Sequence, residues 1–194
     1  MALSVEEQIQ LFFQHPSIQP AIPGVCSVLH LLRRDVLSCL GVDLSSGKQS
    51  DSPIIWPGIM GILAGIDLLA KFYAGNDDFG GVTDRFKTFV GKYFDMSADD
   101  SELVYQLRNS VLHSFGWYSR KKNGAEYRFV VGGGDPTGPL TANPKSDVYI
   151  VNWVRLFADF ESAIGRYRGD LENDADLKTR FASMSSNYGS MYIG

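Results

Sequence analysis

A chain of 194 residues is long enough for one well-buried domain and short for two, so we expect a single domain over residues 1–194. Its apolar fraction of 44% and charged fraction of 21% are those of a globular protein and exclude a disordered chain. The net charge of −4 excludes a protein whose whole surface binds nucleic acid, so any such contact must be a local basic patch.

The sequence predicts neither a targeting signal nor a membrane span. The first residues, Met1–Glu7, contain no positive and no apolar segment, so we expect a cytoplasmic protein without a secretory signal. The longest apolar run, Ile54–Ile66, is shorter than the roughly 20 residues that a crossing needs and predicts a core helix. Cys26 and Cys39 fall in one predicted helix, about 20 Å apart, which excludes a disulfide between them. No Cys and His spacing indicates a metal site, and we expect no cofactor.

The first half of the chain has the apolar spacing of helices. Ser4 followed by Glu7 is a capping box, which predicts a short helix that ends before Pro16. Apolar residues then repeat at helical spacing from about Gly24, and Gly41 is a suitable end for that helix. The later helices are expected from Pro57 to Ala74 with its end at Gly75, around Phe86, Phe89, Val90 and Tyr93, and from about Ala98 to Phe115 between Ser97 and Gly116.

The pattern changes after residue 116. Tyr127, Phe129 and Val131 alternate with other residues and predict a strand, and the short apolar run 148–151 predicts its hairpin partner. The glycine-rich stretch 132–139 between them is expected to be a loop. The remaining expectations are a helix from Trp153 to Leu171, a shorter helix from about Asp174 that uses Leu177, Phe181 and Met184, and a loose tail from Ser185.

These elements predict a mainly α fold. We expect an up-and-down bundle of five to six helices with one inserted β-hairpin, whose strands are about 125–132 and 147–152. The bundle core would span about 24–116, and the hairpin and C-terminal helices would follow over 117–184.

The helix expected over 98–115 carries the residues that point to chemistry. At about 100° per residue, Asn109 and His113 lie together on the face away from the core. Arg108 lies at the border of that face, with a side chain long enough to reach the same opening. Arginine can hold phosphate oxygens and histidine can exchange a proton near neutral pH, so the three residues suit work on a phosphodiester. The expected apolar face consists of Leu103, Leu107, Val111 and Phe115.

This segment resembles the motif helix of HEPN domains. Arg108-Asn109 followed by His113 is similar to the R-x4-6-H signature of that family, which has a polar residue after the arginine. The stretch from Asp67 to Lys71 resembles the family's acidic-x-x-x-Lys helix. The resemblance covers residues 24–116 and implies a helical bundle that forms a homodimer, with two motif helices facing each other. Many members are metal-independent endoribonucleases of toxin or defence systems, although this chain departs from compact members by continuing well beyond the motif.

The resemblance also implies a role for each residue. His113 would be the general base or acid at a ribose 2′-hydroxyl, and Arg108 would stabilise the pentavalent phosphorane. Asn109 would position one or both of them, and Asp67 would orient Arg108. Such a reaction leaves a 2′,3′-cyclic phosphate and uses no metal. The ordinary alternative is that Arg108 and His113 are solvated, or paired with a nearby carboxylate of the same helix.

The densest basic and aromatic cluster follows the motif helix directly. It could hold RNA phosphates near the site while its tyrosines stack on bases. The alternative is a basic hairpin tip whose lysines keep an edge strand from aggregating. The cluster consists of Tyr118, Arg120, Lys121, Lys122, Tyr127 and Arg128.

The sequence therefore leads to a HEPN-like homodimer that is a candidate metal-independent endoribonuclease with RNA as its partner. One alternative is a binding or scaffolding module that keeps the bundle and cuts nothing. Another is a regulatory partner of a nucleotidyltransferase or toxin. The acidic net charge favours the binding module, and the basic stretch beside the motif favours the enzyme.

Overall fold

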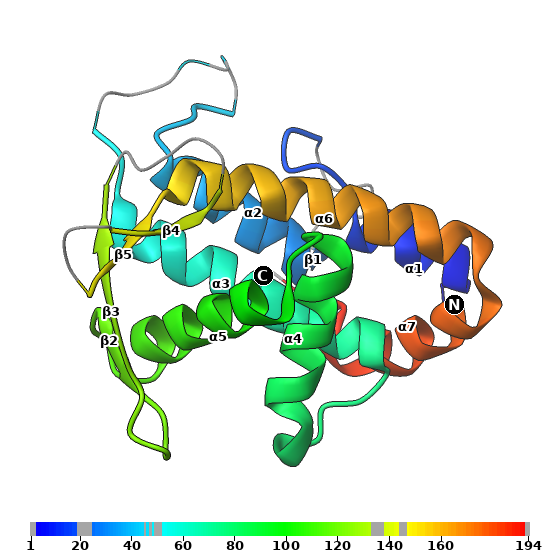
Figure 1. Cartoon of the computed structure of the whole chain (residues 1–194). Coiled ribbons are helices and arrows are strands. Elements are labelled where there is room, and N and C mark those ends of the chain that lie inside the picture. Colours follow the sequence, from blue (N-terminus) through cyan, green and yellow to red (C-terminus); the bar gives the residue numbers. More distant parts are fainter. Residues whose placement is uncertain are drawn as a thin grey trace.

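The computed structural model describes residues 3–18, 25–44, 46, 48, 52–132, 138–143 and 147–192, and these form a mainly helical fold, as predicted (Figure 1). The expected loop 132–139 and the expected helix start at Gly24 fall largely outside these residues. The described helices are α1 (Val5–Phe12), α2 (Val28–Cys39), α3 (Ile55–Ala74), α4 (Val82–Tyr93), α5 (Ala98–Leu112), α6 (Trp153–Asn173) and α7 (Ala175–Tyr188), with a 3-10 turn, η1 (Phe79–Gly81). The described strands are β1 (Val25–Ser27), β2 (Tyr118–Arg120), β3 (Glu126–Val131), β4 (Leu140–Ala142), β5 (Tyr149–Val151) and β6 (Ser190–Tyr192).

Several helices begin and end at the residues that the sequence predicted. The capping box is present at α1, where Ser4 accepts a hydrogen bond from the Glu7 amide and the Glu7 carboxylate accepts one from the Ser4 amide. Ser97 caps α5 by accepting from the amide of Asp100. α3 ends at Gly75, which has the left-handed φ of 72° that favours glycine. Local side-chain and backbone chemistry is therefore sufficient to set these boundaries.

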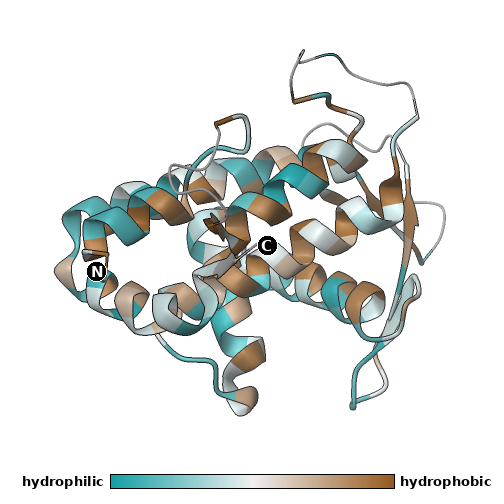
Figure 2. Ribbon diagram, turned by 180° about the vertical axis from the view of Figure 1, so that it is seen from behind, coloured by the Kyte–Doolittle hydropathy of each residue, from teal (hydrophilic) through white to brown (hydrophobic). Residues whose placement is uncertain are grey.

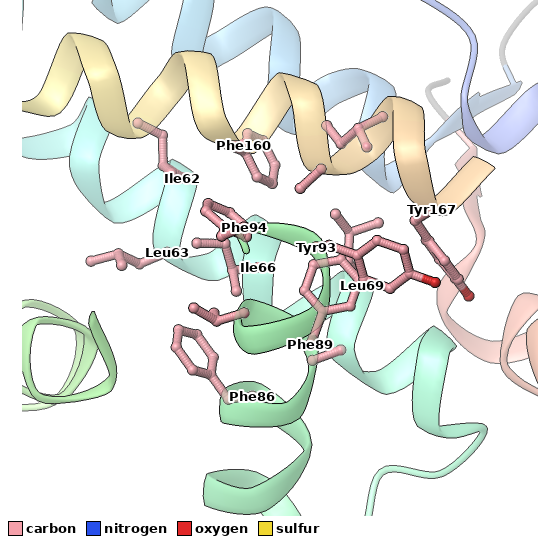
Figure 3. Close-up of a cluster of buried hydrophobic side chains, with 14 of the residues drawn as sticks. Ile62, Leu63, Ile66, Leu69, Phe86, Phe89, Tyr93, Phe94, Phe160 and Tyr167 are labelled. Atoms are coloured by element: carbon pink, nitrogen blue, oxygen red, sulfur yellow. The ribbon is translucent and has the colours of Figure 1, made fainter. Parts of the chain in front are cut away.

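α3 is the central helix of the fold. It packs against α2, α4, α5, α6 and α7, and Figure 3 shows side chains of α3, α4 and α6 pointing toward one another in the core. α3 is also the one described helix long and apolar enough to cross a bilayer by length and composition, and half of its most apolar window is buried within the fold. The outer helices are amphipathic, with hydrophobic residues on one face and hydrophilic residues on the opposite face (Figure 2). The residues labelled in Figure 3 are Ile62, Leu63, Ile66, Leu69, Phe86, Phe89, Tyr93, Phe94, Phe160 and Tyr167.

Gly65 allows α3 to approach both α2 and α6 closely. A Cβ atom at this position would lie 2.5 Å from Cζ of Phe160 and 3.0 Å from Cδ2 of Leu32. The first contact is shorter than real Cβ atoms show and the second is unusually tight, so a larger residue would need Phe160 or Leu32 to shift. Asp67 lies two residues after this close approach.

A four-stranded sheet with the order β2-β3-β5-β4 stands at one end of the helices (Figure 1). The prediction that 125–132 and 147–152 form a hairpin is wrong, because β3 and β5 pair in parallel, with Phe129 opposite Tyr149. The antiparallel partners are β2 for β3 and β4 for β5. Alternation along a strand reports which face is buried and does not report the direction of the neighbour.

A second, two-stranded sheet pairs the segment before α2 with the segment after α7. β1 pairs antiparallel with β6, and Cys26 lies opposite Met191. Two predictions are therefore wrong: the second helix begins at Val28 and not near Gly24, and the tail after Ser185 continues as α7 and β6. Ser27 marks the change from strand to helix because its side chain accepts from the amide of His30. Cys26 and Cys39, both free thiols, thus belong to different elements.

The described residues hold seven α-helices, and not five or six. In Figure 1 α4 runs across the direction of α6, so at least this pair departs from an up-and-down arrangement.

α5 ends earlier than predicted. The helix stops at Leu112, and Phe115 has a left-handed φ of 46° and a 70% exposed side chain. The prediction that Phe115 belongs to the apolar face is therefore wrong. The turn is held by the amide of Gly116, which donates to the carbonyl of Ser110 at 2.9 Å. Because the chain leaves the helix here, His113 is its C-cap and not a residue of its last turn.

Candidate functional site

Asp67, Arg108, Asn109 and His113 meet where α3 packs against α5. Nε and Nη2 of Arg108 donate to Oδ2 of Asp67 at 2.7 and 2.6 Å. Nη1 donates to Oδ1 of Asn109 at 3.1 Å and also contacts Nε2 of His113. The structure therefore brings together all four residues that the sequence predicted for the site.

The burial of these side chains differs from the sequence expectation for Arg108. Arg108 is 8% exposed, so it lies under the protein surface and not at the border of a solvated face. Asn109 is half-buried and His113 is exposed. Arg108 is buried because the side of α5 that carries it packs against α3. α3 supplies the Asp67 carboxylate, and this ion pair offsets the cost of burying the cation.

The surroundings of His113 favour the neutral form of its imidazole. A guanidinium has only N–H donors, so Arg108 can donate a hydrogen bond to Nε2 of His113 only while that nitrogen carries no proton. The covering of the ring by its neighbours and the charge of Arg108 both lower the pKa of His113, and the charge of Asp67 partly opposes them. His113 is therefore neutral at pH 7 and is a proton acceptor held beside a cation.

A groove of about 720 Å³ opens beside this cluster. Arg108, Asn109 and His113 line it together with residues of α2, α3, η1, α4 and α7. Among them is Lys71, which lies one turn after Asp67 on α3. The groove is thus large enough for a nucleotide-sized molecule. Of its cations, Lys71 is half-buried, whereas Arg85 and Arg108 are buried in its wall.

The basic and aromatic cluster predicted to bind RNA lies on the hairpin formed by β2 and β3. None of its six members lines the groove beside His113. Lys121 pairs with Glu102 at 3.0 Å, and Arg128 pairs with Glu126 at 3.3 Å and lies over the Tyr118 ring. RNA binding by this hairpin stays a prediction. Its described members are Tyr118, Arg120, Lys121, Lys122, Tyr127 and Arg128.

Glu102 connects the hairpin to the helices. Although its burial opposes the effect, hydrogen bonds from Gln106, Lys87 and Lys121 lower the pKa of Glu102 to about 2. The carboxylate therefore stays charged and holds Lys121 against α5. This pairing leaves Lys121 less available to a phosphate than its position in the sequence suggests.

Sequence reasoning gave no role in the site to four charged or aromatic residues that line the groove: Lys71, Phe79, Arg85 and Tyr188. Lys71 was named in the motif with Asp67, and its position four residues later places it on the same face of the helix. Phe79, Arg85 and Tyr188 come from three other elements, and nothing in the local sequence indicates that they meet.

Within the described ranges, no group of three or more His, Cys, Asp or Glu side chains could hold a metal ion. The carboxylate of Asp67 and the amide oxygen of Asn109 both accept hydrogen bonds from Arg108. Arg108 has only N–H donors and cannot bind a metal ion. Comparison with known proteins found no matching family model, no matching curated protein and no matching solved structure.

Proposed function

We propose that this protein is a HEPN-like, metal-independent endoribonuclease that works as a homodimer. One observation carries the proposal: Arg108 contacts a neutral, exposed His113 at a groove wall, while Asp67, which lines the same groove, accepts two hydrogen bonds from the guanidinium. A proton acceptor and a fixed cation side by side are the two groups that transesterification at a ribose phosphate requires.

Substrate binding would release His113 for chemistry. A phosphate oxygen is a charged acceptor and competes with a neutral imidazole for the Nη1 proton of Arg108. Nε2 of His113 then takes the proton of the ribose 2′-hydroxyl, and the 2′ oxygen attacks the adjacent phosphorus. The bond from phosphorus to the 5′ oxygen breaks, and that oxygen leaves with a proton from water. The hydroxide that remains takes the proton from the His113 imidazolium, which restores the neutral imidazole. Arg108 stabilises the charge on the phosphorane, and the products are a 2′,3′-cyclic phosphate and a 5′-hydroxyl.

The homodimer is supported by the surface around His113. Phe115 is two residues further on and 70% exposed, although aromatic side chains are usually covered. A symmetric contact through this turn would cover Phe115 and bring a second Arg108 and His113 near the first pair. The composite site would then hold two cations against one scissile phosphate.

The test is cleavage of mixed RNA by the purified protein in the presence of EDTA. We expect cleavage by the wild type with 2′,3′-cyclic phosphate ends, and a loss of about 100-fold or more in His113→Ala and Arg108→Ala. His15→Ala and Arg168→Ala are matched controls, because neither residue lines the groove. No cleavage by the wild type, or equal cleavage by all five proteins, would remove the enzyme proposal.

A non-catalytic binding module is the second candidate. The observation that favours it is that Arg108 already contacts Asp67, Asn109 and His113 of its own chain. An arginine that only stabilises the fold has contacts of the same kind. RNA that is bound but not cut, with equal affinity in His113→Ala, would support this candidate in place of the enzyme.

We also propose a cytoplasmic location. Both cysteines are free thiols, and burial together with the charge of Asp35 raises the pKa of Cys39, so its thiol stays protonated. Unpaired thiols are common in a reducing compartment.

A further inference from the structure

The groove beside His113 has further lining residues that take no part in the proposed chemistry, and we call Lys71, Phe79, Arg85 and Tyr188 its far half. Lys71 follows Asp67 by one helical turn, about 6 Å along the axis of α3. Arg85 of α4, Phe79 of η1 and Tyr188 of α7 line the same half. Four elements therefore converge on a second set of charged and aromatic side chains.

Neither cation of this half forms an ion pair with a described carboxylate, although both lie near enough to Asp77 to act on it: the pKa of Asp77 is lowered by the Tyr188 hydrogen bond and also by the charges of Lys71 and Arg85. Of the carboxylates that the structure describes, none lies within 4.0 Å of the Lys71 ammonium or the Arg85 guanidinium. Lys71 lies over the Tyr188 ring, 4.7 Å from its centroid, and Nη1 of Arg85 donates to the carbonyl of Asp78 at 2.7 Å. Asp77 also lines the groove, and the Tyr188 hydroxyl donates to its carboxylate. Lys71, Arg85 and Arg108 together outnumber Asp67 and Asp77, so the groove favours an anionic ligand.

The aromatic component is Phe79. Its side chain is 97% exposed although it is fully apolar, and it lies at the edge of the groove. It belongs to the three-residue turn η1 between α3 and α4, and its side chain is not part of the hydrophobic core. An exposed ring beside unpaired cations is the arrangement that binds a nucleobase and its phosphate together.

We propose that the far half of the groove binds the nucleotide next to the scissile one in a single-stranded RNA. Lys71 and Arg85 would hold its phosphate, and its base would stack on Phe79. A duplex keeps its base faces stacked inside the helix and cannot offer one to Phe79, so the site selects single strands. This inference rests on the proposed function for the identity of the ligand as RNA.

The test measures binding with a probe that cannot be cut. A fluorescent single-stranded RNA, 2′-O-methylated at every position, has no 2′-hydroxyl to attack, and its affinity is read by fluorescence anisotropy with and without its complementary strand. We expect the single strand to bind more tightly than the duplex and Phe79→Ala to weaken binding about 10-fold. Phe79→Tyr should restore most of the affinity. Lys71→Gln should lower the slope of log affinity against log salt by about 0.7.

Two matched variants control for changes elsewhere on the surface. Val154→Ala removes an apolar side chain of α6 that is 54% exposed, and Arg168→Gln removes a cation of the same helix. Neither residue lines the groove, so both variants should bind like the wild type. Because Phe79 has almost no contacts with the core, Phe79→Ala should keep the circular dichroism spectrum of the wild type.

The possible failures are distinguishable. Equal binding by wild type and Phe79→Ala, or a preference for the duplex, overturns the subsite. So does a Phe79→Ala variant that loses a dimer contact and keeps its RNA affinity, since Phe79 would then belong to a protein interface. If the probe binds as expected but unmodified RNA is never cut, the subsite stands and the endoribonuclease proposal falls.

Discussion

The guanidinium of Arg108 has partners from both α3 and α5, and this determines what the neighbouring imidazole can do. Asp67 takes two of its hydrogen bonds and Asn109 a third, which fixes the plane of the guanidinium. The same guanidinium also contacts Nε2 of His113. Removing one charged partner should therefore change the pKa of His113 in a direction that depends on which charge is lost.

At the residue scale we predict opposite shifts in two variants. Arg108→Gln removes a cation and should raise the pKa of His113, whereas Asp67→Asn removes an anion and should lower it further. The measurement is an NMR titration of the His113 Cε1 proton. In the wild type the midpoint should lie below 6.5, so cleavage should be constant near neutral pH and fall as the pH drops through that midpoint. Shifts in the same direction would contradict the contact.

Two helical elements decide where Asp67 lies. α3 approaches α2 and α6 closely at Gly65, two residues before Asp67, where the Phe160 and Leu32 side chains leave no room for a Cβ atom without a shift. The Asp67 carboxylate then faces Arg108 of α5. The site is thus held by the packing of rigid helices and by a cap at the end of α5, and not by a long loop.

At the element scale we predict opposite effects for two Gly→Ala changes. Gly65→Ala gains helix propensity but places a Cβ 2.5 Å from Phe160, so it should destabilise the protein by about 1 to 3 kcal/mol. Gly165→Ala, in α6, meets nothing within 4 Å and should stabilise it by about 0.5 to 1 kcal/mol. Urea unfolding followed by circular dichroism measures both. Equal free energies of unfolding in the two variants would show that α3 can move to accommodate the methyl group.

The whole molecule presents two exposed phenylalanines near the groove, and we assign them different roles. Phe79 lines the groove, whereas Phe115 lies outside it on the turn after His113. The basic hairpin of β2 and β3 forms a separate surface, attached to α5 through Glu102. The acidic net charge of the chain is therefore compatible with local cationic regions.

At the scale of the whole molecule we predict that Phe115→Ser converts a dimer into a monomer. The change removes the apolar ring that a symmetric contact would cover, and sedimentation or light scattering gives the mass. Ile18→Ser, at a side chain that is 56% exposed, is the matched control and should leave the mass unchanged. A wild type that is a monomer at all concentrations would contradict the composite site.

The sequence by itself determined most helix boundaries and the identity of the cluster of four residues. Ser4, Ser97 and Gly75 act on backbone groups a few positions away, so their effects can be read from neighbouring residues alone. The period-two alternation of β3 is equally local. The grouping of Arg108, Asn109 and His113 followed from the helical repeat, and that of Asp67 from a family resemblance.

Only the tertiary structure decided which elements lie beside one another. The parallel pairing of β3 with β5, the burial of Arg108 and the meeting of Lys71 with Phe79 and Arg85 all join residues whose sequence neighbours carry no sign of the contact. The physical reason is that caps and periodicity are short-range, whereas these contacts follow from how whole helices and strands bury their apolar faces together.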